Sequence, residues 1–330
     1  LLARGADPAI IARNRAEVDT VKRISRRQFA RGLGATLATG PFFLSRWAGA
    51  EEAAAVAQSG PLVAVVEGKS PAALVRAAID ALGGIRTWVK PGHKVVVKPN
   101  IGWDRLPAMA ADTNPQVVGE IVRLCKEAGA AKVLVFDRTC NDARRCYTSS
   151  GIAAAAQEAG AETPYIRESD LQFRFRTISI PDGQRLKEWP VYSDALDADV
   201  YINVPIAKHH SLTQLTLGIK NTMGILGGER GSLHVDIAEK LADIHRVFKP
   251  TLTVMDAYRV LLRNGPTGGN PRDTELKFTM IAGEDPVAVD AYTTTLFGLT
   301  PQDVAYIPAC ARAGVGTDQL DRIQLKRVQV

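Results

Sequence analysis

Short apolar runs alternate with longer amphipathic segments along residues 61–160. The runs are rich in β-branched residues and do not alternate apolar with polar positions, which is typical of strands buried on both faces of a parallel sheet. The segments between them have helical length, and one begins with Thr113-Asn114-Pro115, a capping residue followed by proline. We expect strands at 62–66, 94–98 and 132–137 and helices at 71–82, 113–128 and 150–159.

The second half of the chain has a more mixed pattern. Residues 173–180 alternate apolar with polar positions, which predicts a half-exposed, antiparallel strand. Further buried strands are expected at 199–205, 251–256 and 277–282, and helices at 233–248, 286–297 and 304–313. Together the elements predict a three-layer α/β fold over residues 61–330, with a mainly parallel or mixed sheet and helices on both faces. This domain could form one body or two lobes of about 61–170 and 171–330.

Residues 1–60 have the layout of an export signal. The paired arginines Arg26 and Arg27 precede Phe29, a weakly apolar stretch follows at 32–44, and small-residue sites follow that. Twin arginines before a bulky apolar residue resemble a twin-arginine (Tat) signal. We expect the Tat translocase to export the protein to the periplasmic side of the cytoplasmic membrane. The apolar stretch is shorter than the ~20 residues that span a bilayer. The sequence is compatible with a leader that is cleaved and with one that is retained as a membrane anchor.

Composition and charge remove several classes of protein. The chain has 330 residues, of which 46% are hydrophobic and 23% charged, values that exclude a disordered chain and a polytopic membrane protein. The formal net charge is +6, but residues 1–60 hold nine basic and five acidic side chains. The remainder carries only +2, so the sequence gives no support for nucleic-acid binding.

The sequence contains no motif that identifies a cofactor. Its four cysteines, Cys125, Cys140, Cys146 and Cys310, include no C-x-x-C pair, so neither a zinc ribbon nor a ferredoxin-type iron–sulfur motif is present. Cys140 and Cys146 are close enough in sequence to form a disulfide in an oxidising compartment. The glycine patterns of dinucleotide-binding and P-loop sites are also missing. The cofactor therefore stays unknown.

Polar residues follow several of the expected strands. Lys98 to Asn100 follow one strand, Asp137 and Arg138 another, Lys208 to His210 a third, and Asp256 ends a fourth. In open α/β sheets, ligands bind at the carboxyl ends of the strands. If these strands are parallel neighbours, their polar ends converge on one cleft.

The richest chemistry lies between residues 205 and 234, where three of the five histidines accompany two lysines and glycine-rich turns. Lysines and backbone amides can hold a phosphate or a carboxylate, and imidazoles can move protons or ligate a metal. No fixed metal-ligand spacing is present, so a small anion is the favoured ligand. The expected ligand-binding residues are Lys98, Asn100, Lys208, Lys220, Asn221, Asp256 and Asp290, and the candidates for acid, base or metal ligand are His209, His210 and His234.

These motifs, in this order, resemble the domain of unknown function 362 family. The resemblance spans most of residues 61–320 and is carried by Lys98-Pro99-Asn100, Thr113-Asn114-Pro115, Pro205 to His210, Lys220-Asn221, Met223-Gly224, His234, Lys249-Pro250, Asp256, Asn264 to Pro266 and Asp285 to Asp290. Members of that family often begin with a Tat signal, and many carry a ferredoxin-like cysteine cluster that this sequence lacks. Because the family has no settled reaction, the resemblance implies an architecture more than an activity.

Two functional hypotheses follow. The first is an exported α/β protein with a polar cleft for a small anionic ligand or a metal, its reaction and even its status as an enzyme left open. The second is a non-catalytic accessory subunit of a membrane-bound complex, tethered by an uncleaved leader, since a fold can be recruited without its chemistry.

Overall fold

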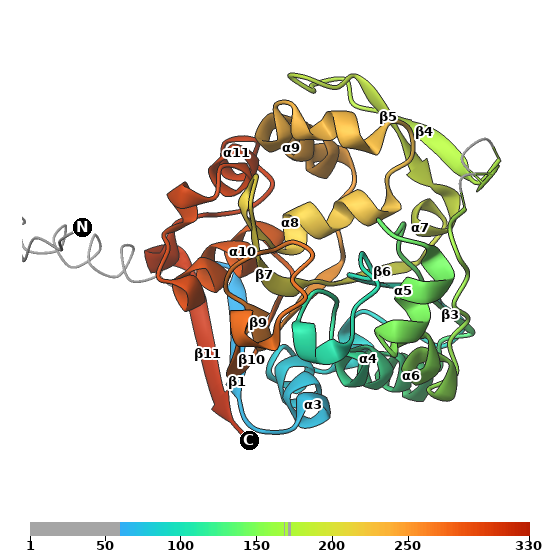
Figure 1. Ribbon diagram of the computed structural model, residues 1–330, viewed down its shortest axis with the longest axis vertical. Coiled ribbons are helices and arrows are strands. Elements are labelled where there is room, and N and C mark those ends of the chain that lie inside the picture. Colours follow the sequence, from blue (N-terminus) through green and yellow to red (C-terminus); the bar gives the residue numbers. More distant parts are fainter. Residues whose placement is uncertain (1–59, 168, 171–172) are drawn as a thin grey trace, which may run out of the picture. The chain divides into compact units, whose positions relative to one another are not determined.

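A mixed sheet runs through the centre of the protein (Figure 1). The structure, a computed structural model, describes residues 60–330 apart from 168, 171 and 172, so the predicted leader lies outside the described residues. Within the described part of the chain the sheet has nine strands, in the order β11-β1-β10-β9-β6-β2-β3, with β7 paired to β9 and β8. The strands are β1 (Leu62–Glu67), β2 (Lys94–Pro99), β3 (Lys132–Val135), β6 (Val200–Val204), β7 (Ile206–His210), β8 (Gln214–Thr216), β9 (Leu252–Leu261), β10 (Thr274–Gly283) and β11 (Gln324–Gln329).

Parallel pairing in the middle of the sheet brings several strand ends to one edge. β3, β2, β6 and β9 are parallel neighbours, and in this register Lys98 of β2 lies opposite Asn203 of β6. β7 continues along β9 in the same direction. β10 and β1 complete the sheet in antiparallel pairs, and β11 is parallel to β1. The carboxyl ends of β2, β3, β7 and β9 therefore share an edge, as the sequence pattern predicts.

Helices cover both faces of the sheet (Figure 1). One face packs against α3 (Pro71–Ala81), α4 (Pro115–Glu127), α5 (Ala143–Ser149) and α6 (Ile152–Glu158), and the other against α8 (Gly218–Asn221), α9 (Ile237–Val247), α10 (Pro286–Thr294) and α11 (Tyr306–Arg312). Alternate residues of each strand enter the two apolar cores. In β2, for example, Val95 and Val97 pack with α4 and Val96 packs on the opposite side. The predicted three-layer α/β fold is confirmed.

A two-stranded antiparallel sheet of β4 (Phe175–Ser179) and β5 (Glu188–Tyr192) lies apart from the main sheet, and α7 (Ser193–Leu196) follows it. Most side chains of β4 are exposed or half-buried, as the alternating pattern of this segment predicts. The main sheet takes β1, β2 and β3 from the first half of the chain and its other strands from the second half. No helix within the described ranges is long and apolar enough to cross a membrane.

The structure differs locally from the sequence prediction in three places. One helix is predicted at 150–159, but the structure has two helices in this region. The additional helix α5 comes first, and Gly151, with φ 71°, separates it from α6. The helix expected to begin at residue 233 begins at Ile237, after a 3-10 turn over Arg230–His234. Lys208 to His210 do not follow a strand but form the end of β7, so their side chains alternate between its two faces.

Candidate functional site

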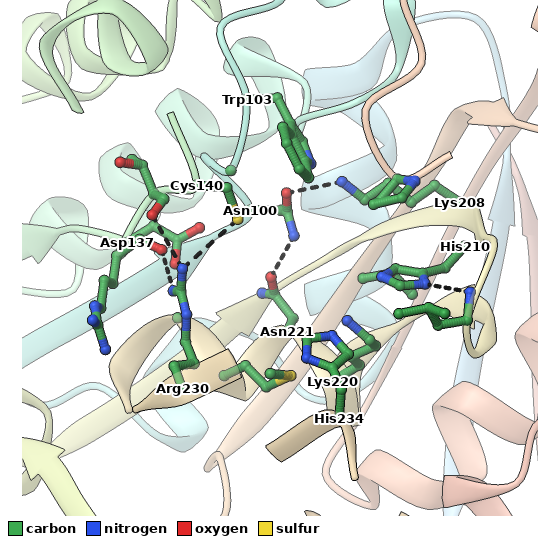
Figure 2. Close-up of a pocket in the computed structure, with 18 of the residues that line it drawn as sticks. Asn100, Trp103, Asp137, Cys140, Lys208, His210, Lys220, Asn221, Arg230 and His234 are labelled. Carbon is green, nitrogen blue, oxygen red and sulfur yellow. Dashed lines mark hydrogen bonds between the residues drawn. The ribbon is translucent and has the colours of Figure 1, made fainter. Parts of the chain in front are cut away.

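A pocket of about 560 Å³ opens at the edge where β2, β3 and β7 end (Figure 2). Residues that follow β2 and β3 form one side, and β7, α8 and the 3-10 turn before α9 form the other. These segments are far apart in sequence, and the parallel order of the strands brings them together. The pocket has the size of a typical small-molecule site, about 300–1,000 Å³.

Lys98 and Asn221 build the polar floor of the pocket. Nζ of Lys98 lies 2.9 Å from Oδ1 of Asp137 and donates a hydrogen bond to Oδ1 of Asn221 at 3.0 Å. Nδ2 of Asn221 donates to Oδ1 of Asn203 at 2.8 Å, which fixes the orientation of the amide. Burial lowers the pKa of Lys98, and the carboxylate of Asp137 opposes this effect. The charge of Lys98 is thus compensated within the protein.

Asn100 links this floor to a second lysine. Its Nδ2 donates to Oδ1 of Asn221 at 3.0 Å, and its Oδ1 accepts a hydrogen bond from Nζ of Lys208 at 3.2 Å. Nζ of Lys208 also donates to the carbonyl oxygen of Ala111. Burial lowers the pKa of Lys208 to about 8, and the nearby carboxyl of Asp112, whose own pKa burial raises to about 7, acts in the opposite direction. One continuous chain of hydrogen bonds therefore crosses the pocket.

Lys220 differs from the other two lysines. Its residue is 8% exposed, it lines the pocket from α8, and within the described residues its ammonium has no hydrogen-bond or ion-pair partner. Burial and, to a smaller extent, the positive charges of Lys208 and Arg230 lower the pKa of Lys220 to about 8, while Cys140 acts in the opposite direction. A largely desolvated ammonium without a counter-charge is unfavourable. The pocket consequently presents a cation that the protein itself leaves unsatisfied.

Two imidazoles stack at the same wall of the pocket. The rings of His210 and His234 have centroids 6.2 Å apart and planes inclined by 24°. Nδ1 of His210 accepts the backbone N–H of Leu212 at 3.1 Å, so its proton is on Nε2. Nδ1 of His234 faces the carbonyl oxygen of Gly231 at 3.1 Å, so this ring carries its proton on Nδ1 and offers Nε2 as an acceptor.

Both imidazoles are neutral at physiological pH. Burial lowers the pKa of His210 to about 3, and the charge of Lys220 adds to the shift. Burial and the charge of Lys220 also lower the pKa of His234. The pair therefore presents one N–H donor and one basic nitrogen side by side, which is a suitable arrangement for proton transfer.

Sequence reasoning missed several lining residues. Arg230 donates to the carbonyl oxygens of Arg138 and Thr139, and its Nη2 lies 3.7 Å from Sγ of Cys140. Trp103 lies beside Asn100 in Figure 2. The sequence signals for these residues were weak. Arg230 lies in a glycine-rich turn soon after Lys220. The others follow the ends of strands, where the sequence pattern marked only one or two positions as candidates.

Three of the ten predicted site residues lie away from the pocket lining. His209 is on the opposite face of β7 from its neighbours, and its Nδ1 accepts the backbone N–H of Gly265 at 3.1 Å. Asp256 accepts the backbone N–H of Asn114 at 2.8 Å at the start of α4. Asp290 accepts two backbone N–H groups at the start of α8, at 2.7 and 2.9 Å. The two carboxylates thus hold the helices that carry or flank the site, and a ligand in the pocket would not touch them.

The charge of the pocket lining favours anions. Among the described residues, five basic side chains and one carboxylate line it: Lys98, Arg138, Lys208, Lys220, Arg230 and Asp137. The described part of the chain contains no group of three or more His, Cys, Asp or Glu residues placed to hold a metal ion. Cys140 and Cys146 are both free thiols, the first exposed and the second buried. The residues present are therefore suited to a carboxylate or a phosphate rather than to a cation.

Known proteins share parts of this sequence. A thylakoid-associated protein of Synechocystis sp. is 28% identical over 257 residues, which cover 76% of this chain and 77% of that protein. The lactate racemase apoprotein of Thermoanaerobacterium thermosaccharolyticum has a distant structural likeness, with a TM-score of 0.36 and 14% sequence identity over 77% of this chain. The chain spans 57% of the length of that racemase.

The resemblance noted from the motifs is confirmed by a family model. That model matches residues 95–295, which hold most of β2, all of α4, β6, β7, α8, β9 and α10, and with them the lysines and histidines of the pocket. The matched region is more than half of the chain, and the protein belongs to the family of the domain of unknown function DUF362.

Proposed function

We propose that the pocket binds a small organic anion, a carboxylate or a phosphate ester, with Lys220 as its main counter-charge. The observation that carries this proposal is the largely buried side chain of Lys220, which lines the pocket and whose ammonium has no partner among the described residues. Lys208 and Arg230 add positive charge on either side, and the amide of Asn100 keeps one N–H with which to orient a ligand, whereas the amide of Asn221 is fully hydrogen-bonded within the protein. Charge-assisted hydrogen bonds to these groups would be among the stronger polar contacts available.

Lys220 is the pocket lysine that lacks a carboxylate neighbour among the described residues. Desolvating an ammonium costs several kcal/mol when no opposite charge compensates for it. Lys98 has Asp137 and Lys208 has Asp112 nearby, whereas Lys220 has other cations as its charged neighbours. A bound anion would supply the missing charge, and its binding would stabilise the folded protein by mass action.

Thermal unfolding in the presence of an anion panel tests the proposal. The panel holds phosphate, acetate, pyruvate, 2-oxoglutarate and phosphoenolpyruvate, each tested on the wild type, on Lys220→Met and on the exposed control Lys69→Met. We expect at least one anion to raise Tm by about 5 °C at a hundredfold excess over its Kd. The shift should persist in Lys69→Met and vanish in Lys220→Met. Absence of any shift in the wild type, or equal shifts in all three proteins, would overturn the proposal.

We also propose that the protein is exported by the Tat system and works at the membrane surface, as an enzyme or as an accessory subunit of a membrane-bound complex. The paired Arg26 and Arg27 support export. The thylakoid association stated in the name of the Synechocystis relative supports a membrane location. A retained leader would be the tether.

Fractionation of cells that express the full chain tests this second proposal. The wild type should reach the membrane fraction on the periplasmic side, and Arg26→Lys/Arg27→Lys should stay inside the cell. N-terminal sequencing of the exported protein then shows whether residues 1–60 remain. A freely released, truncated monomer would remove the accessory-subunit alternative, and export that does not depend on the two arginines would remove the Tat assignment.

A further inference from the structure

The three lysines of the pocket differ in what their nitrogens do. Nζ of Lys98 donates to Asn221 and pairs with Asp137, and Nζ of Lys208 donates to Asn100 and to Ala111. Lys98, which also donates to the carbonyl oxygen of Pro99, would give up one of its three contacts if it lost a proton, and both remaining N–H groups of a neutral Lys208 would stay engaged. Lys220 has no such partner among the described residues, so its lone pair becomes available without breaking any contact.

The surroundings of Lys220 also favour the neutral amine. It is nine-tenths buried, and the nearby charges of Lys208 and Arg230 repel a proton on its nitrogen. These effects lower the pKa of Lys220 to about 8, so about a tenth of the molecules carry the free amine at pH 7. A desolvated lysine beside other cations is one of the recognised ways of making an amine nucleophilic.

Side chains that can donate or accept protons lie next to this amine. Figure 2 shows Lys220, His210 and His234 together at one wall of the pocket, and the charge of Lys220 influences both rings. His234 offers Nε2 as an acceptor, and His210 offers its Nε2–H as a hydrogen-bond donor. Arg230, which pairs with no carboxylate among the described residues, remains available as a counter-charge, so the site has a place for a carbonyl and a place for an acid group.

We propose that Lys220 condenses with the carbonyl carbon of a 2-oxo acid bound in this pocket and forms an imine; the proposal rests on the anion site proposed above. The lone pair of Nζ attacks the carbonyl carbon, the C–N bond forms, and the carbonyl π electrons move to the oxygen. His234 accepts a proton from the nitrogen and returns it to the oxygen, which makes a carbinolamine. His234 then takes the remaining proton from the nitrogen and delivers it to the hydroxyl, the C–O bond breaks, water leaves and the nitrogen lone pair forms the C=N bond, so the step needs no oxidant or reductant.

Reductive trapping tests the imine. The purified protein is incubated with pyruvate, 2-oxobutyrate or 2-oxoglutarate, reduced with sodium borohydride, and analysed by intact mass spectrometry and peptide mapping. We expect one reduced adduct per chain on Lys220 with at least one of these acids, retained in Lys69→Met. Lys220→Arg keeps the charge but lacks a nucleophilic amine near neutral pH, and should give at least about tenfold less adduct.

The outcomes separate the two proposals. Trapping that falls on exposed lysines, or that is equal in Lys220→Arg, overturns the imine. An absence of adduct with every 2-oxo acid, while anions still raise Tm through Lys220, overturns the imine and leaves the anion site standing. An absence of both the adduct and the Tm shift overturns both. Peptide mapping of the wild type gives a result even if the Lys220→Arg variant fails to fold.

Discussion

Nζ of Lys98 and Oδ1 of Asp137 lie 2.9 Å apart in a buried ion pair, with side chains 1% and 4% exposed. Lys98 belongs to β2, and Asp137 follows the neighbouring parallel strand β3 by two residues. The other carboxylate oxygen of Asp137 accepts the backbone N–H of Ile101 at 2.7 Å, which ties the loop after β2 to the pair. The floor of the pocket thus contains two buried charges that compensate each other.

Removing one member of this pair should destabilise the protein strongly. Lys98→Met leaves the carboxylate of Asp137 buried without its counter-charge, and we expect a loss of about 3–5 kcal/mol in the free energy of unfolding. Lys98→Met/Asp137→Asn removes both charges and should lose clearly less than the sum of the two single variants. Urea unfolding at pH 7 measures all three variants. Strict additivity would show that the two charges do not interact.

Gly224 packs directly against the same pair. A methyl group at this position would overlap the carboxylate of Asp137 and the ammonium of Lys98, both of which are buried and fixed. Gly224→Ala should therefore cost at least about 1–3 kcal/mol, the usual range for overpacking. Gly231→Ala is the matched control, because a Cβ there meets no atom within 4 Å and both glycines line the pocket. Equal unfolding midpoints for the two variants would contradict this packing.

The sequence predicts the convergence of the site well because it depends on strand order and direction. Buried strands that lack alternation indicate a parallel sheet, and polar residues at their ends must then meet at one edge. Lys98 and Asn100 reach the pocket for this reason, and Lys208 and His210 do so from β7. The alternation of side chains along β7 also explains why His209 does not reach it. No local pattern marks these residues as part of a strand, so this alternation was not predicted.

Other features depend on contacts that leave no local signature. Asp256 and Asp290 stand among chemistry-bearing motifs, yet each carboxylate accepts backbone N–H groups from a helix start that is distant in sequence. Arg230 enters the pocket from a short 3-10 turn that no periodic pattern marks. Sequence periodicity describes strands and helices, whereas the partner of a buried carboxylate is decided by tertiary packing.

A variant of Asp256 can therefore show whether this carboxylate has a structural role or binds the ligand. Asp256→Asn places an amide where Oδ2 accepts the backbone N–H of Asn114, so one good acceptor is weakened. We expect a loss of about 1–3 kcal/mol in stability and an unchanged Kd for any anion that binds the wild type. Urea unfolding and calorimetric titration measure the two quantities separately. A large loss of affinity at retained stability would show that Asp256 takes part in ligand binding.

The tautomer of His210 is open to direct observation. Because Nδ1 accepts the N–H of Leu212 and burial lowers the pKa to about 3, His210 should stay neutral from about pH 4 to pH 8 with its proton on Nε2. Long-range ¹H–¹⁵N correlation spectra of the ligand-free protein report both features, and His210→Gln identifies the signal. Titration of this ring near the ordinary pKa of 6.5 would contradict the buried geometry.

The pKa of Lys220 gives opposite pH dependences for folding and for ligand binding. Burial and the neighbouring cations lower it from 10.5 to about 8, so between these values the folded protein binds fewer protons than the unfolded chain. The contribution of Lys220 to the free energy of unfolding should therefore rise with pH from about 8 to 10.5, and Lys220→Met should lack this rise. Urea unfolding of the ligand-free wild type and variant across that range measures the difference.

Anion binding should weaken over the same range, because only the ammonium form of Lys220 attracts an anion. We expect Kd for a simple carboxylate such as acetate to increase about tenfold per pH unit above pH 8. Imine formation needs the neutral amine instead, so borohydride trapping of a 2-oxo acid should become faster as the pH approaches 8 from below. Calorimetry and timed trapping on the same preparation separate the two uses of one nitrogen. A carboxylate affinity that stays constant between pH 7 and pH 10 would mean that the charge of Lys220 does not hold the ligand.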